Sequence, residues 1–543
     1  MSDSPKPEQT PLAIVGMGCL FPKAQGAKEF WANIKNRVDG ITEIPASHWS
    51  PEDYFDKDPK RPDFTYARRG GFLSPVEFDP AEFGISPNTL EATDSAQLLG
   101  LVAAQMALRD AGYGPEKEYD RSRVSVILGV TGTLELVVPL GARLGHPVWR
   151  KALHEAGIEG EQAEGIIERI KDGYVPWQEN SFPGLLGNVV AGRIANRFNL
   201  GGTNCVVDAA CGSSLSAAHL ASLELTTGRA SMVVTGGVDC FNDIFMNMCF
   251  SKTPALSPGG DAKPFDRTAD GTALGEGLGM LVLKRLADAE RDGDRIYAVL
   301  KGVGSSSDGR GKAIYAPSSE GQVKALRQAY EVAGVTPDTV ELVEAHGTGT
   351  SVGDTVEVEA LKEVYAATGR KGAWCALGSV KSMIGHTKAA AGSAGMIKAA
   401  LALHHKVLPP TIKVTEPIAA LSGETPFYLN TQTRPWTRGA HPRRAAVSAL
   451  GFGGANFHAV LEEYAPKKTE IDWSGETQVF SFSGSDAASL KSALAPLSKE
   501  MTWDESRIAA FKSRAAFKRS DAARLSFVVE KGKSVSALAA SAS

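Results

Sequence analysis

The chain has 543 residues, of which 58 are basic and 62 acidic, for a formal net charge of −4. This balance gives no electrostatic reason to expect nucleic acid or an anionic membrane as a partner, and no apolar run reaches the length of a membrane span. The length allows several domains or one large duplicated domain. The six cysteines have neither zinc-type spacing nor a regular disulfide pattern, so we expect reduced thiols, no metal site and a cytoplasmic protein.

Apolar runs that end in glycine turns alternate with helical periodicity through the first half of the chain. The polar segment 1–10 has no secretory apolar core and predicts a disordered lead-in. Residues 11–20 read as a buried strand, whose Gly-Met-Gly turn lacks the third glycine of a dinucleotide-binding fingerprint. The same patterns predict helices at 27–37, 96–111 and 181–198 and strands at 124–130 and 230–238.

A charged segment at 133–180 interrupts this alternation. Its two helical patterns, at 148–157 and 162–171, are interpreted as a solvated surface pair, and the alternative is a contact with a partner or a second copy. Further on, residues 250–277 form a long loop, and loops of this length in compact domains are more often functional than idle.

The stretch from Asn204 to His219 holds the leading candidate for a reactive group. A short β-branched run leads to Cys211, and a Gly-Ser-Ser turn then opens an alanine-rich helical pattern. A helix N-terminus offers unpaired N–H groups and a partial positive charge. We therefore expect a lowered thiol pKa and N–H groups that can hold an oxyanion. For a lone cysteine, a buried structural role is the alternative.

The second half repeats the order of strand, glycine turn and helix. We predict two related α/β halves, each with a mixed sheet and covering helices. Three strand ends in this half carry polar residues or glycine turns, and they lead to His346, to Lys381 with His386, and to Phe452. A single histidine is more often a hydrogen-bonded core or loop residue. However, sites in α/β proteins assemble at the carboxyl ends of strands, which favours one shared site with Cys211.

The composition changes after Tyr464. Residues 467–473 read as a polar linker, 477–483 as a short strand and 487–500 as a helix. We interpret 465–543 as a small α/β linker or the start of a following module, partly disordered.

Several ordered motifs resemble those of the β-ketoacyl synthase (ketosynthase) family of fatty acid and polyketide synthases, over about residues 11–464. Three further stretches most resemble the ketosynthases of polyunsaturated fatty acid synthases: His386-Thr-Lys, 400–410 and 426–436. The family motifs are Asp208-Ala-Ala-Cys211-Gly-Ser-Ser, Lys263-Pro-Phe-Asp266-Arg, Gly275-Glu-Gly277, Glu344-Ala-His346-Gly-Thr-Gly-Thr350, Lys381-Ser-Met-Ile-Gly-His386 and Gly451-Phe452-Gly-Gly-Ala-Asn456.

This resemblance implies a thiolase-like fold of α-β-α-β-α layers, with halves at about 11–290 and 291–464, that is normally a homodimer. It also implies an acyltransferase that performs decarboxylative condensation with malonyl-carrier protein. The acyl carrier protein would deliver substrates on its phosphopantetheine arm, with no cofactor bound directly, and an acyltransferase module would lie adjacent or act in trans.

The resemblance assigns roles to individual residues. Cys211 would hold the acyl chain, and its N–H with that of Phe452 would form the oxyanion hole. His346 and His386 would stabilise the enolate as neutral N–H donors. The remaining roles are pantetheine binding by Thr348 and Thr350, gating by Phe452, orientation of the histidines (or a structural salt bridge) by Lys381, and structural support by Asp354 and Asn456.

One position departs from the family pattern. Stand-alone bacterial ketosynthases carry a glutamate nine residues after the second histidine, and Gly395 stands there in this chain. Lys381 therefore needs another partner, and Glu344 and Asp354 are the candidates. The glycine also favours a multidomain parent enzyme.

Two alternative functions compete with the condensing enzyme. A non-catalytic, chain-length-factor-type partner of another ketosynthase usually lacks the cysteine that is present here. A thiolase-like enzyme without decarboxylation needs a second cysteine near the C-terminal motif, and the stretch from Phe452 to His458 contains none.

Overall fold

The computed structural model describes residues 10–114, 116–132, 135–310, 313–314, 316–464 and 476–542. The disordered lead-in was expected at residues 1–10, and residues 1–9 lie outside this part. In the described residues, no helix has the length and apolarity needed to cross a membrane. The chain divides into a larger unit of Met1–His404, Pro409–Thr433 and Gly439–Tyr464, and a smaller unit of His405–Leu408, Arg434–Arg438 and Ala465–Ser543.

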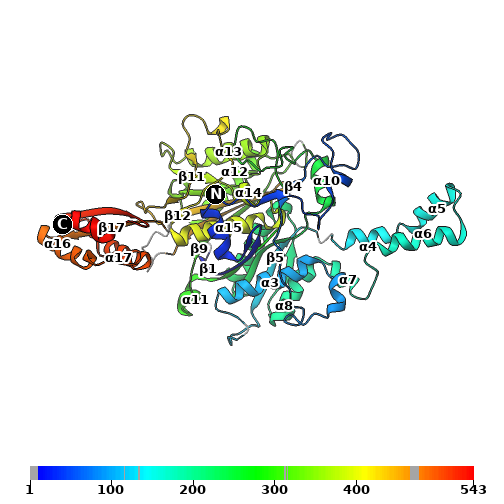
Figure 1. The fold of residues 1–543 in the computed structure, drawn as a ribbon, viewed down its shortest axis with the longest axis horizontal. Coiled ribbons are helices and arrows are strands. Elements are labelled where there is room, and N and C mark those ends of the chain that lie inside the picture. Colours follow the sequence, from blue (N-terminus) through cyan, green and yellow to red (C-terminus); the bar gives the residue numbers. More distant parts are fainter. Residues whose placement is uncertain are drawn as a thin grey trace, which may run out of the picture. The chain divides into compact units, whose positions relative to one another are not determined.

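A large mixed sheet forms the centre of the larger unit (Figure 1). Its strand order is β13-β11-β10-β15-β16-β9-β1-β8-β7-β5-β6, and β2 pairs with β1. The strands are β1 Leu12–Phe21, β2 Ala24–Gln25, β5 Val124–Val130, β6 Asn204–Val207, β7 Met232–Asp239, β8 Gly277–Arg285, β9 Ala298–Ser307, β10 Leu342–Glu344, β11 Cys375–Gly378, β13 Phe427–Leu429, β15 Arg444–Gly451 and β16 Ala455–Glu463.

The two halves of the sheet repeat one topology. The first half runs β6-β5-β7-β8-β1 and the second β11-β10-β15-β16-β9, so both have the order 3-2-4-5-1 when their strands are numbered along the chain. In each of these orders the first three strands pair in parallel and the last two join antiparallel. Antiparallel pairing of β1 with β9 connects the halves. The predicted pair of related α/β halves is therefore confirmed.

Helices lie on both outer faces and between the halves. In Figure 1, α12 and α13 lie on one side of the sheet and α3 and α8 on the other. Between the halves, α9 and α15 meet where the Ser214 hydroxyl accepts the N–H of Ser393. All residues of α15 from Ala391 to Leu403 are buried, as expected for a helix that is apolar all round. These helices are α3 Ser95–Asp110, α8 Asn188–Phe198, α9 Ser213–Thr226, α12 Ser319–Ala333, α13 Ser351–Ala366 and α15 Ala391–His405.

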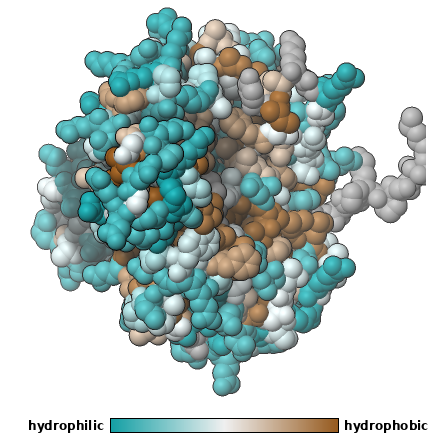
Figure 2. Space-filling view, turned by 90° about the vertical axis from the view of Figure 1, so that its right-hand side faces the viewer, coloured by the Kyte–Doolittle hydropathy of each residue, from teal (hydrophilic) through white to brown (hydrophobic). Residues whose placement is uncertain are grey.

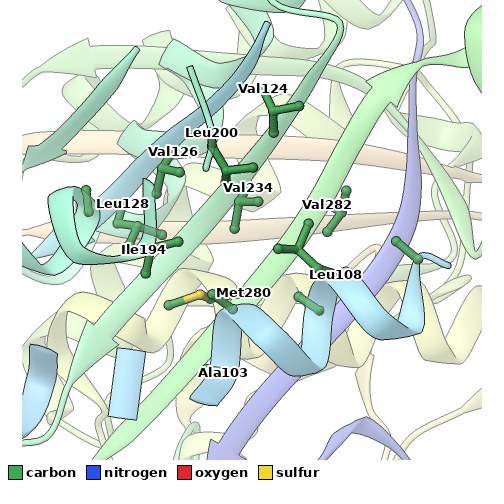
Figure 3. Packing of buried hydrophobic residues seen from close by; sticks show 14 of the residues in the cluster. Ala103, Leu108, Val124, Val126, Leu128, Ile194, Leu200, Val234, Met280 and Val282 are labelled. Atoms are coloured by element: carbon green, nitrogen blue, oxygen red, sulfur yellow. The ribbon is translucent and has the colours of Figure 1, made fainter. Parts of the chain in front are cut away.

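The core of the first half forms where α3 packs on the sheet. Figure 3 shows Ala103 and Leu108 of α3 against Val234, Met280 and Val282 of neighbouring strands. The Gly-Met-Gly stretch, expected to be a turn, lies within β1. Its glycines belong to this contact and not to a nucleotide site. A Cβ on Gly18 would lie 2.2 Å from the carbonyl oxygen of Ala103, so only glycine lets β1 approach the helix this closely.

The charged insertion is helical, as predicted. It forms α4 Val137–Arg143, α5 His146–Glu155 and α6 Gly160–Asp172, and α5 and α6 lie side by side in Figure 1. Among the described residues 135–180, only Leu136, Leu140, Ala163 and Ile167 are buried, so most of this segment is a solvated surface.

The smaller unit is a small α/β structure with its own core. An antiparallel pair of strands packs with helices around buried residues that include Phe480, Leu494 and Val529. The expected disorder in 465–543 stays a prediction, since 465–475 and 543 lie outside the described residues. Its main elements are β17 Thr477–Gly484, α16 Ala487–Leu494, α17 Trp503–Ala516, β18 Ala523–Glu530 and α18 Val535–Ala542.

Replacing Gly18 with alanine is expected to destabilise the protein by about 1–3 kcal/mol, the usual cost of overpacking. The added Cβ would meet the backbone of Ala103 and of Ala107 at 2.2 and 2.5 Å, and neither can move without shifting α3. Thermal unfolding measures the effect. Gly165→Ala in α6 is the control, because nothing lies within 4 Å of its added Cβ. A Gly18→Ala protein as stable as the wild type would contradict this packing.

Candidate active site

Cys211 lies in a sharp turn between strand β6 and helix α9. A single 3₁₀ turn, Ala210–Gly212, separates the two elements, and Ala210 has a left-handed φ of 48°. On β5, a Cβ at Gly129 would lie 2.4–2.7 Å from the backbone of Ser213 and Ser214, so glycine lets the helix begin directly on the sheet. The turn buries Cys211, which is 7% exposed.

His386 and His346 complete a cluster with Cys211. The Nε2 atom of His386 is 3.1 Å from the Cys211 sulfur. The His346 ring stands nearly perpendicular to that of His386, with 5.3 Å between their centres. His346 follows β10 and His386 follows α14 (Lys381–Ile384), so three separate chain segments build the cluster.

Backbone N–H groups determine the tautomer of both histidines. The N–H of Lys388 donates to Nδ1 of His386 at 3.2 Å, and the N–H of Leu450 donates to Nδ1 of His346 at 3.3 Å. A ring nitrogen that accepts a hydrogen bond carries no proton, so each neutral ring carries its proton on Nε2. Burial lowers the pKa of both histidines well below its ordinary value, with Lys381 adding to the effect. Both rings are therefore neutral N–H donors at pH 7.

The thiol does not have the lowered pKa that the helix N-terminus led us to expect. Burial raises the pKa of Cys211 to about 11, because removal from water disfavours the thiolate. Lys381 and Lys388 lower this pKa and Asp239 raises it, but burial is the largest cause. Cys211 is therefore a neutral thiol at rest beside neutral histidines.

A cavity of about 460 Å³ opens onto this cluster. Phe452 on its wall is 50% exposed and lies nearly parallel to Phe250, 6.2 Å away. A Cβ on Gly451 would be 2.1 Å from the Ala209 carbonyl, so the segment that carries Phe452 lies directly against the Cys211 turn. The expected site residues on its lining are Cys211, His346, Thr348, Thr350, Asp354, His386, Phe452 and Asn456. A larger cavity, about 690 Å³, holds none of them.

Comparison with known proteins identifies the relatives of this site. The chain matches the family "Beta-ketoacyl synthase, N-terminal domain" at residues 9–289, its C-terminal domain at 297–415, and the ketoacyl-synthetase C-terminal extension at 416–529. It is 44% identical over 465 residues to one subunit of the polyunsaturated fatty acid synthase of a Thraustochytrium species, covering 84% of the chain and 16% of that protein. It is 38% identical over 468 residues to the polyketide synthase PksL of Bacillus subtilis, covering 85% of the chain and 10% of that protein.

A solved structure gives the same result. The ketosynthase from module 6 of the bacillaene synthase of Bacillus subtilis 168 matches with a TM-score of 0.72 and 33% identity, over 98% of this chain and 84% of that one. The chain belongs to the β-ketoacyl synthase family. The thiolase-like fold and the activity class, a condensing acyltransferase, are those of a ketosynthase. The chain spans 16% or less of the length of the two curated relatives named above.

Lys381 of this ketosynthase has a different partner from those expected. Its ammonium group donates to the backbone carbonyl of His346. The candidate Glu344 pairs instead with Lys398 at 2.6 Å, and the candidate Asp354 accepts the N–H groups of Phe265 and Gly349. Burial lowers the pKa of Lys381, and nearby carboxylates, Glu344 first, raise it. Lys381 thus holds the His346 loop through the backbone.

Gly395 lies against the side chain of Glu344. A Cβ at Gly395 would lie 3.1 Å from the Glu344 side chain, so the absence of a side chain leaves room for that carboxylate. From there Glu344 accepts the N–H of Val380 at 2.6 Å, next to Lys381, and pairs with Lys398 one turn along α15.

Glu357 and Lys398 are among the buried charged residues around the site that sequence reasoning missed. Glu357 accepts the N–H of His346 at 2.7 Å and that of Gly347 at 2.8 Å, so one carboxylate holds two consecutive amides of the histidine loop. The signal was present, because Glu357 is three residues after Asp354 and so shares its face of a helix. Lys398 had no such signal.

Glu344→Ala is expected to destabilise the protein by about 3–5 kcal/mol, because it leaves the Lys398 ammonium buried and unpaired. Replacing both residues, Glu344→Ala with Lys398→Met, is expected to restore most of this loss. Denaturant unfolding measures both. Glu424→Ala is the control, since its pair with Lys371 is exposed on both sides and contributes little. A double variant no more stable than Glu344→Ala would contradict the pairing.

Proposed function

We propose that this chain condenses an acyl group held on Cys211 with a malonyl group carried by an acyl carrier protein, in polyunsaturated fatty acid or polyketide biosynthesis. The observation that carries the proposal is the pair of Nε2–H donors, on His346 and His386, beside the Cys211 sulfur in one cavity. A nucleophile and two preset donors match the needs of thioester chemistry.

The first step loads the enzyme. The Cys211 sulfur attacks the acyl thioester, a new sulfur–carbon bond forms, and the bond to the pantetheine sulfur breaks. The thiol proton of Cys211 ends on the leaving pantetheine thiol. The backbone N–H groups of Cys211 and Phe452 stabilise the oxyanion of the tetrahedral intermediate. Because the resting thiol is neutral, it must lose its proton during the attack.

The second step uses the two histidines. The malonyl thioester enters after the first carrier leaves, with its arm along Thr348 and Thr350, whose hydroxyls are 2.9 Å apart. Its carbon–carboxylate bond breaks, carbon dioxide departs, and the electron pair forms an enolate. The Nε2–H groups of His346 and His386 donate to the thioester oxygen as charge develops there. Neutral donors suit this task because they need no proton from solvent.

The third step forms the carbon–carbon bond. The enolate carbon attacks the carbonyl carbon of acyl-Cys211, the bond to the cysteine sulfur breaks, and a β-ketoacyl thioester leaves on the carrier. The Cys211 thiolate takes up a proton and the cycle closes. Phe452 separates the two half-reactions as a gate, which its half-exposed position on the cavity wall permits.

The molecular context is that of a larger synthase. The 44% identity to a protein of polyunsaturated fatty acid synthesis supports a fatty acid product over a polyketide. The carrier protein supplies both substrates on phosphopantetheine, no other cofactor takes part, and an acyltransferase module adjacent or in trans supplies the malonyl group. We place the enzyme in the cytoplasm.

A homodimer is the proposed assembly. Strand β6 lies at one edge of the sheet. Among the described residues it pairs with β5 alone, so its other edge could pair with a second copy. Figure 2 faces the side where Figure 1 places α4 to α6, α7 (Ser181–Leu185) and α10 (Ile244–Lys252). It shows hydrophobic side chains gathered among hydrophilic ones. The exposed large apolar residues of these helices include Val137, Val138, Phe182 and Phe245.

The chain-length-factor-type alternative has less support. The relatives include a subunit of a polyunsaturated fatty acid synthase and a ketosynthase of the bacillaene synthase, and Cys211 is present here with both histidines. The thiolase-like alternative needs a second cysteine at the site. Among the described residues, Cys211 is the only cysteine that lines the 460 Å³ cavity.

Incubation with acyl-carrier thioesters of increasing chain length is expected to add one acyl mass to the intact protein. Cys211→Ala is expected to abolish this gain, and the length that loads best outlines the acyl pocket. Cys249→Ala is the control, because that exposed thiol lies outside the proposed chemistry and its loss should leave loading unchanged. Loading that persists in Cys211→Ala, or no loading with any donor, would contradict the nucleophile.

His346→Ala and His386→Ala are each expected to slow carbon dioxide release from malonyl-carrier by about 10²–10³-fold, the usual effect of removing one oxyanion donor. The release of labelled carbon dioxide measures this directly. His154→Ala on the exposed insertion is the control and should leave the rate unchanged. Normal release in both histidine variants would contradict their role as donors to the thioester oxygen. No release by the wild-type protein would favour the non-decarboxylating alternative.

A further inference from the structure

A buried ion pair lies behind the catalytic cluster. Lys388, two residues after His386, contacts the carboxylate of Asp239 at 3.0 Å, and their side chains are only 4% and 3% exposed. Asp239 is the last residue of β7 and Lys388 opens the 3₁₀ turn η4 (Lys388–Ala390). Neither residue lines the cavity, so the pair touches no substrate there.

The ion pair connects the turn after His386 with the end of β7 and with the segment at Gly275. The Lys388 ammonium also donates to the Gly275 carbonyl at 2.9 Å, and Asp239 accepts the N–H of Ala389 at 3.3 Å. Gly237, on the same face of β7 as Asp239, allows this approach, since a Cβ there would lie 2.4 Å from the Ala389 carbonyl. The turn after His386 is thereby fixed at the end of β7.

The backbone of Lys388 has an unfavourable conformation with a direct effect on His386. Its φ is 45°, a left-handed value that a residue with a side chain keeps only when its surroundings enforce it. In this conformation its N–H donates to Nδ1 of His386 at 3.2 Å. That bond determines which nitrogen of His386 carries the proton and aims Nε2 at Cys211.

We propose that Lys388 and Asp239 are a pair of positioning residues for His386 and Cys211. Their ion pair holds the strained turn whose N–H orients His386. Their opposite charges act on the Cys211 thiol from outside the cavity. The His386 part of this inference rests on the proposed function, whereas the effect on the thiol does not.

The titratable and charged groups that act on the Cys211 thiol come from several elements packed around it. His386 contacts the sulfur, His346 shares its cavity, and Lys381 acts from α14. Lys388 lowers the pKa of Cys211, and Asp239 raises it. Because the two members of the pair act in opposite directions, their separate removal distinguishes an electrostatic role from loss of folding, which would change both variants in the same direction.

The experiment measures the rate of Cys211 alkylation by iodoacetamide between pH 7 and 9.5, followed by the mass of the Cys211 peptide. Asp239→Asn is expected to accelerate alkylation and Lys388→Met to slow it, each on the order of tenfold for a charge buried nearby. Lys388→Met with Asp239→Asn should return close to the wild-type rate. Lys284→Met is the control: its ammonium is also buried, against Asp292 and Asp294, away from the site.

Carbon dioxide release from malonyl-pantetheine tests the positioning of His386. Lys388→Met is expected to lower kcat about tenfold or more with little change in KM. The reason is that the Nε2–H of His386 is misaligned while the pantetheine arm of the substrate still binds. Lys388→Arg, which keeps the charge, should recover part of the rate. Melting temperatures identify any variant that fails to fold, and Asp239→Asn and the double variant then carry the test.

The proposal would be overturned if the alkylation rate changed in the same direction in both single variants, or if it changed in neither of them. So would a normal kcat in Lys388→Met. If the wild-type protein releases no carbon dioxide while the alkylation rates still change in opposite directions, the proposed function fails and the electrostatic role of the pair stands.

Discussion

Two backbone N–H groups, those of Lys388 and Leu450, control the chemistry of this site. By donating to Nδ1 of His386 and His346, they keep the proton of each ring on Nε2, toward Cys211 and the cavity. Burial keeps both rings neutral. With these bonds, each ring has an N–H donor in place before any substrate arrives, and the positions of the two loops decide whether the bonds exist.

Buried charges hold those loops. Glu357 binds two amides at His346, Lys381 binds the carbonyl of the same residue, and Lys388 with Asp239 fixes the turn after His386. Taking charges out of water is costly unless each is paired and hydrogen-bonded. Here the bonds go largely to backbone groups of the catalytic loops, so the charges specify loop geometry more than they add stability. The same burial raises the pKa of Cys211.

Two glycines of the sheet allow the segments that follow Cys211 and His386 to pack closely on it. Gly129 and Gly237 are neighbours in the register of β5 and β7, and each receives a backbone segment within a distance that any Cβ would block. The first accepts the start of α9, just after Cys211, and the second accepts η4, just after His386. Two adjacent positions of one sheet thus set the spacing between nucleophile and donor.

The sequence by itself determined the α/β class, the duplication, and the placement of Cys211 and His346 shortly after strands, because alternating apolar runs, glycine turns and motif spacing are local properties. His386 was expected at a strand end, but helix α14 separates it from β11. Only the tertiary structure decided the protonation of the thiol, the partner of Lys381 and the roles of Glu344, Glu357 and Lys398. Those depend on burial and on contacts between residues far apart in the chain, such as Lys388 with Asp239. A helix N-terminus in the sequence predicted a lowered thiol pKa, but the sequence does not reveal how completely the fold removes that thiol from water.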